Sequence, residues 1–205
     1  PYYPPQLESE LDKKWRIAAE NDELYSLVKS SITNSDMDDF SRNLSLLNIE
    51  TQWFEWVLND LYDMLAIISS QRNPYIQMSN ISNSTTSRFK KHGQMQGFAD
   101  LTLGSKHFWL SQFSYCDSNK NKNYENYLKS LNSFIKHRNK IIHHLFSPKT
   151  TTVNKTRRIK AALVLAKTLI AETDWHNSLL AEHLLNNMGT YWDFGSLNNK
   201  SSRIA

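Results

Sequence analysis

The chain contains few of the residues that form cross-links and tight phosphate-binding loops. Its 205 residues include one cysteine, Cys116, which excludes an internal disulfide and a cysteine-rich zinc cluster. Five glycines and five prolines are too few for a glycine-rich phosphate loop, a collagen-like repeat or a proline-rich linker array. No apolar run approaches the roughly 20 residues that a membrane span needs, and no apolar secretion signal is visible. These absences predict a cytoplasmic protein without a membrane partner, folded as one domain over residues 1–205.

Charge is distributed unevenly along the sequence. Residues 1–63 contain 13 acidic and five basic residues, whereas residues 118–160 contain 11 Lys or Arg and one acid, Glu125. Such asymmetry predicts a basic face for a polyanion. The alternative is that the acidic and basic segments pair with each other in the fold.

Apolar residues recur at helical spacing in four stretches, at about 7–31, 37–68, 123–146 and 155–188. The second stretch is the most regular, with Phe54, Leu58, Leu61 and Leu65 on one predicted seam. Residues 72–104 have no clear pattern and are typical of a functional loop or a partly disordered segment. Residues 106–115 suit either a strand or a helix, and 117–123 suit a loop. We therefore predict an all-α four-helix up-and-down bundle with an insertion at 72–115 and a C-terminal tail at 189–205.

The third predicted helix carries an arginine on its apolar stripe. At about 100° per residue, Arg138 falls at the centre of the stripe, where a guanidinium must be paired or line a cleft. Asn139 and His143 lie on one shoulder of this helix, and His137 and His144 lie on the other. Arginine can bind a phosphate through two parallel hydrogen bonds, and histidine can transfer a proton near neutral pH. The set suits metal-independent phosphodiester cleavage in which a ribose 2′-OH attacks phosphorus, so the predicted substrate is RNA.

Arg138 and Asn139, followed by three residues and His143, resemble the signature of the HEPN superfamily. The resemblance implies a helical bundle with the motif late on a long helix, and a homodimer whose two motifs face one cleft. It implies an endoribonuclease acting on tRNA or mRNA without a cofactor, with these three residues as the catalytic trio. It further implies a toxin or anti-phage defence effector, with an antitoxin or regulatory protein as a further partner. Some members carry Glu and Lys where this chain has Ser130 and Phe134, so the anticodon-nuclease subtype is not expected.

Other basic residues on and after this helix are predicted to contact RNA, although a plain solvated face is the alternative. They are Lys140, His144, Lys149, Lys155, Arg157 and Arg158. An Arg and a His at the motif spacing also occur by chance, so a second hypothesis is a non-catalytic helical module that binds RNA or a protein. His107, His176 and His183 are interpreted as structural or surface residues, and no metal site is predicted.

Overall fold

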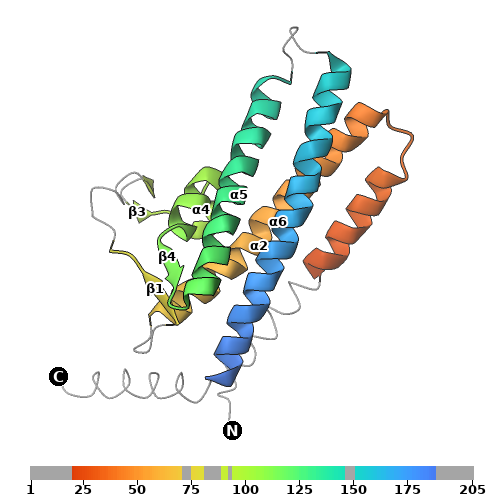
Figure 1. The fold of residues 1–205 in the computed structure, drawn as a ribbon. Coiled ribbons are helices and arrows are strands. Elements are labelled where there is room, and N and C mark those ends of the chain that lie inside the picture. Colours follow the sequence, from red (N-terminus) through yellow and green to blue (C-terminus); the bar gives the residue numbers. More distant parts are fainter. Residues whose placement is uncertain (1–19, 71–74, 81–88, 92–93, 146–150, 188–205) are drawn as a thin grey trace, which may run out of the picture. The chain divides into compact units, whose positions relative to one another are not determined.

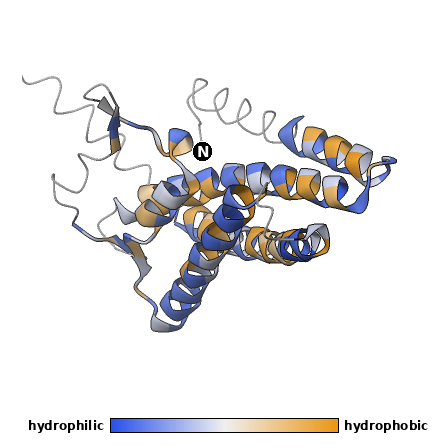
Figure 2. Ribbon diagram, turned by 90° about the horizontal axis from the view of Figure 1, so that it is seen from above, coloured by the Kyte–Doolittle hydropathy of each residue, from blue (hydrophilic) through white to orange (hydrophobic). Residues whose placement is uncertain are grey.

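The computed structural model describes residues 20–70, 75–80, 89–91, 94–145 and 151–187, and these are mostly helical (Figure 1). Residues 20–33 are helical. Three long α-helices and one short one follow: α2 (Asp39–Ser69), the short α4 (Leu103–Leu110), α5 (Ser118–His143) and α6 (Thr152–Asn186). Hydrophobic and hydrophilic residues alternate along the long helices, as their amphipathic patterns require (Figure 2). The prediction of a predominantly helical protein is confirmed. The predicted tail and the first part of the predicted N-terminal helix lie outside the described residues.

The start of α5 differs from the sequence prediction. Residues 117–123 were expected to form a loop, but the helix already begins at Ser118. Asp117 accepts a hydrogen bond from the backbone N–H of Lys120 at 2.8 Å, which caps the first turn. This polar cap starts the helix before its first buried residue, Tyr124, so the apolar periodicity placed the start too late.

The predicted insertion contains short elements that the sequence pattern did not indicate. Strand β1 (Ile76–Met78) pairs antiparallel with β4 (Phe113–Tyr115), and β2 (Lys90–Lys91) pairs with β3 (Gln94–Met95). A 3-10 turn, η2 (Phe98–Asp100), precedes α4. Residues 106–115, expected to be strand or helix, are divided between the two, since α4 ends at Leu110 and β4 begins at Phe113.

The chain divides into two compact units, and each consists of two segments. Unit 1 comprises residues 1–53 and 137–166, and unit 2 comprises residues 54–136 and 167–205. Helices α2, α5 and α6 each contribute residues to both units.

Unit 1 contains a buried carboxylate. Glu50 of α2 is 1% exposed, and its Oε2 accepts a hydrogen bond from Tyr25 Oη at 2.7 Å. Lys29 Nζ lies 2.9 Å from Glu50 Oε1. The Tyr25 ring also stacks on Trp53, with 4.6 Å between ring centroids. A buried charge is tolerated only with such partners, so this cluster fixes the helix at 20–33 against α2.

Unit 2 has a core of aromatic rings with polar ends. Buried Tyr124 donates to the Leu110 carbonyl at 2.8 Å, and Tyr127 Oη lies 2.9 Å from Thr173 Oγ1. Thr173 itself donates to the Leu169 carbonyl at 2.7 Å, so Tyr127 must be the donor in the pair with Thr173.

His176 of α6 lies among these rings and is 2% exposed. Burial lowers the pKa of His176 to about 4, so its imidazole is neutral near pH 7. Tyr115 Oη lies 3.0 Å from His176 Nδ1, and burial raises the pKa of Tyr115, which keeps this phenol protonated. Tyr115 therefore donates to Nδ1, and the imidazole carries its proton on Nε2. The interpretation of His176 as a structural residue is confirmed.

Helix α4 contains a buried lysine, within unit 2. Lys106 is 2% exposed, and its Nζ donates to Asn59 Oδ1 at 2.8 Å and to the Glu55 carbonyl at 3.2 Å. Burial lowers the pKa of this ammonium group. These contacts anchor α4 to α2.

Candidate functional site

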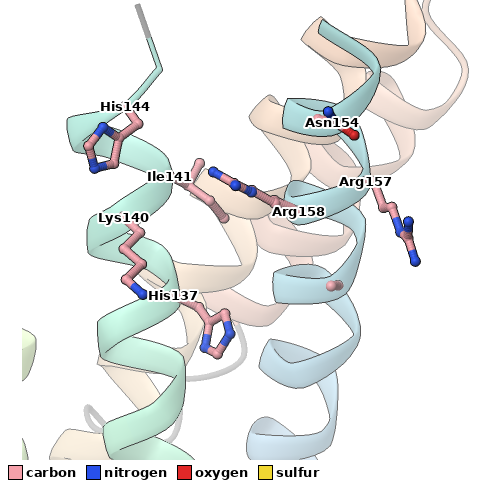
Figure 3. A pocket seen from close by; sticks show the side chains of 8 residues that line it. His137, Lys140, Ile141, His144, Asn154, Arg157 and Arg158 are labelled. Atoms are coloured by element: carbon pink, nitrogen blue, oxygen red, sulfur yellow. The ribbon is translucent and has the colours of Figure 1, made fainter. Parts of the chain in front are cut away.

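A groove of about 720 Å³ lies in unit 1 between the end of α5 and the start of α6 (Figure 3). Its lining comes in equal parts from the two helical segments. His137, Lys140 and Ile141 of α5 and His144 just after it form one side, and Asn154, Arg157, Arg158 and Ala161 of α6 form the other. On each helix these positions follow the steps i, i+3, i+4 and i+7, so each set forms one continuous face. Ile141 is 8% exposed and supplies an apolar part of the lining. Arg158 extends from α6 toward Ile141 (Figure 3).

The groove is positively charged. Lys140, Arg157 and Arg158 line it, and its lining includes no acidic residue. Within the described ranges, no carboxylate forms a salt bridge with any of these three cations. The groove also lies beside the first turn of α6, where the helix dipole adds partial positive charge. Such a lining favours phosphate groups over neutral or cationic ligands.

Five of the six residues predicted to contact RNA belong to this end of unit 1. Lys140, His144, Arg157 and Arg158 line the groove, and Lys155 lines an adjoining hollow together with three of them. The sixth, Lys149, lies outside the described residues. That these side chains contact RNA stays a prediction.

One nearby lysine has an acidic partner instead. Lys160 Nζ lies 2.9 Å from Asp39 Oδ2, and this contact is the main cause that lowers the pKa of Asp39. At this pair, the acidic and basic parts of the sequence meet, as the alternative interpretation of the charge distribution expects. The pair is exposed on both sides, so it contributes little to stability.

The predicted catalytic trio does not line the groove. Arg138 is half-buried, and its Nη1 lies 3.5 Å from Asn139 Oδ1, at the outer limit of a hydrogen bond. Asn139 and His143 are exposed. No hydrogen bond joins the His143 side chain to any residue in the described part of the chain. Arg138 is therefore less enclosed than its place on the stripe predicts.

The apolar stripe itself runs differently at the end of α5. Ile142 was placed on it but is 48% exposed, whereas Ile141 is buried. Leu131, Phe134, Ile135 and Ile141 are buried, and Arg138 lies between the last two. After Arg138, the buried side of the helix is thus the one that carries His137 and His144. The prediction for Ile142 is wrong because one helix cannot reveal on which side its neighbour packs.

Four lining residues were not among the predicted site residues: the polar His137 and Asn154, and the apolar Ile141 and Ala161. The signal for His137 is present in the sequence, since it precedes Lys140 and His144 by three and seven residues on one helix face. Asn154 shares a face with Arg157 and Arg158 in the same way. The sequence alone does not show that these two faces meet.

Comparison of the chain with protein-family models, curated proteins and solved structures finds no match. None of the helices in the described ranges combines the length and apolar character needed to cross a bilayer. In the same ranges, no three His, Cys, Asp or Glu residues are grouped as a metal site would require.

Proposed function

We propose that this protein binds single-stranded RNA along the cationic groove of unit 1 and cleaves it without a metal. The observation that supports RNA binding is the groove lining, which includes two arginines, one lysine and two histidines but no acidic residue. Lysine and arginine side chains neutralise RNA phosphates, and the groove between the two helices gives the RNA backbone a surface to bind along.

The cleavage proposal rests on the resemblance of Arg138, Asn139 and His143 to the HEPN motif. His143 takes the proton of a ribose 2′-OH, or donates a proton to the leaving 5′-oxygen. The 2′-oxygen attacks phosphorus, the bond to the 5′-oxygen breaks, and the products are a 2′,3′-cyclic phosphate and a 5′-hydroxyl. Arg138 stabilises the negative charge that builds on the phosphoryl oxygens, and Asn139 orients the groups.

The exposure of Asn139 and His143 supports a site that is completed by a second copy of the chain. In this proposal, two HEPN-like four-helix bundles form a homodimer, and their motifs face a shared cleft. The role follows from the same resemblance: a toxin or anti-phage effector whose activity an antitoxin or regulatory protein restrains.

A non-catalytic RNA-binding module is the second candidate. It is favoured by the geometry of the motif, because a general base normally has a partner that orients its imidazole. His143 has no such hydrogen bond to the described residues, and the contact between Arg138 and Asn139 is long. In this case the groove binds RNA but no strand is cut.

The two candidates are separated by incubating the protein with tRNA and mRNA in EDTA. We expect cleavage that leaves 2′,3′-cyclic phosphate ends and disappears in His143→Ala. His144→Ala is the matched control, since it removes the adjacent imidazole, and at saturating RNA it should retain cleavage. RNA binding without cleavage by the unmodified protein would refute the nuclease and support the binding module. Unchanged cleavage in both His143→Ala and Arg138→Ala would refute the assigned mechanism.

A further inference from the structure

A small hollow of about 10 Å³ adjoins the cationic groove of unit 1, and basic residues make up much of its lining. The groove and the hollow share Lys140, Ile141, His144 and Arg158. The hollow adds Lys155 and the apolar Leu145 and Ile159. Two lysines, one arginine and one histidine therefore border a space that is far smaller than the groove.

The positive charge around this hollow has no acidic counterpart in the fold. No acidic residue lines it, and in the described part of the chain none of its basic side chains forms an ion pair with a carboxylate. Lys140, His144 and Arg158 are exposed to solvent, and Arg158 extends toward the shared residue Ile141 (Figure 3). Like charges held close together repel each other, and a bound anion removes this repulsion. The hollow therefore favours an anionic ligand.

The size of the hollow limits which part of an anion can enter. A volume of about 10 Å³ holds roughly one water-sized group, so it admits a single phosphate oxygen but neither a ribose nor a base. Ile141 is 8% exposed and Ile159 is fully buried, so the lining is apolar on its inner side. Attraction between opposite charges is stronger beside such a region of low dielectric constant than in open solvent.

An RNA strand offers two kinds of phosphate, and the terminal kind matches the hollow better. An internal phosphodiester carries one negative charge and has a ribose on both sides. A terminal phosphate carries a charge of about −1.5 to −2 at pH 7 and has three unesterified oxygens. Because it has a ribose on one side only, one oxygen can enter the hollow while the other two accept hydrogen bonds from arginine and lysine at its rim.

We propose that the hollow bordered by Lys140, His144, Lys155 and Arg158 binds the terminal phosphate of an RNA strand whose next nucleotides lie in the groove. The inference rests on the proposed binding of RNA in the groove, and it adds which part of the strand is recognised. The proposed cleavage leaves a 5′-hydroxyl and a cyclic phosphate, and neither of these new ends carries a terminal phosphate monoester. The site therefore distinguishes the original phosphorylated end of a strand from ends that cleavage produces.

Binding of short oligouridylates tests this site. Affinity is measured in EDTA and in the His143→Ala background, so that no strand is cut. The probes are pentauridylate with a 5′-phosphate, with a 3′-phosphate or with two hydroxyl ends, and heptauridylate with two hydroxyl ends. The heptauridylate has about the same total charge as a phosphorylated pentauridylate, and it is longer than the groove, whose lining spans about 10 Å along each helix.

We expect at least one phosphorylated pentauridylate to bind about tenfold or more tightly than the hydroxyl-ended one, and more tightly than the heptauridylate. A preference for the 5′-phosphate assigns the hollow to a 5′ end, and a preference for the 3′-phosphate assigns it to a 3′ end. If the heptauridylate binds as tightly as both phosphorylated strands, total charge determines binding and the inference is refuted. If no strand binds at all, the proposed RNA binding fails together with it.

Two residues separate the hollow from the groove. Lys155 lines the hollow but not the groove, and Arg157 lines the groove but not the hollow. Lys155→Ala should therefore bring the affinity ratio of phosphorylated to hydroxyl-ended strands close to one, whereas Lys155→Arg, which keeps the charge, should preserve it. Arg157→Ala should weaken binding of every strand by a similar factor and leave the ratio as it is. Thermal unfolding of each variant verifies that it is folded. A ratio that survives Lys155→Ala would overturn the assignment.

Discussion

Lowering the pH should destabilise unit 2 through histidines whose pKa burial lowers, His107, His183 and above all His176. The pKa of His176 in the folded protein is about 4, against 6.5 for an unperturbed histidine, because the ring is buried. Between these two values the unfolded chain binds a proton that the folded protein does not bind, so the free energy of unfolding falls as the pH falls through this window. One pKa unit corresponds to about 1.4 kcal/mol, so the full contribution is about 3 kcal/mol, and about 2.5 kcal/mol of it is lost by about pH 4.5. Above about pH 7 this contribution is constant.

The assay measures the free energy of unfolding in urea for the unmodified protein and for His176→Gln, at several pH values from about 7.5 to about 4.5. Glutamine does not titrate in this range, and its carbonyl can still accept the hydrogen bond of Tyr115. Glu172 and Asp174 have pKa values raised by burial, which gives a dependence of the opposite sign, so the difference between the two proteins is the quantity to measure. That difference should shrink by about 2.5 kcal/mol across the window. His144→Gln, at an exposed position, should run parallel to the unmodified protein. A difference that does not vary with pH would refute the assignment of a buried neutral imidazole.

Two further predictions concern the groove and the core. Each phosphate contact contributes about −0.7 to the slope of log affinity against log salt for a single strand, so the double variant Arg157→Ala, Arg158→Ala should reduce the slope by about 1.4. Lys167→Ala, an exposed cation elsewhere on α6, should leave the slope unchanged, and a slope unaffected by the double variant would place RNA outside the groove. Tyr127→Phe should lower the free energy of unfolding by about 1 kcal/mol, because its hydroxyl donates to Thr173 inside the core. Urea unfolding checks this value, and an unchanged stability would mean that the two hydroxyl groups are not paired.

The long helices were predictable because their apolar residues repeat at a fixed spacing over many turns. Phe54, Leu58, Leu61 and Leu65 are all fully buried, as the seam of the second predicted helix requires. Such a pattern is local, so no knowledge of the neighbours is needed. The pairing of β1 with β4 was not predictable in the same way, because Ile76 meets Tyr115 across a long stretch of sequence and each strand has only three residues.

The groove shows what sequence periodicity leaves open. A helical wheel of α5 places Asn139 and His143 on one side of the apolar stripe and His137 and His144 on the other. It does not determine which of these two sides faces α6. In unit 1, it is the side with His137 and His144 that meets Arg158, so His144, predicted to contact RNA, and His137, which had no predicted role, both line the groove. The basic residues could be predicted as a group, whereas their common space depends on packing between helices.

The core of unit 2 also has a consequence for how sequences related to this one can be recognised. Tyr115 and His176 satisfy each other, and the neutral imidazole tolerates burial because a protonated phenol donates to it. Replacing either residue alone by an apolar one would leave a buried polar atom without a partner, whereas replacing both by apolar residues would not. Substitutions at these two positions should therefore occur together. A distant relative whose surface differs throughout could still be recognised by whether the buried positions 115 and 176 change as a pair.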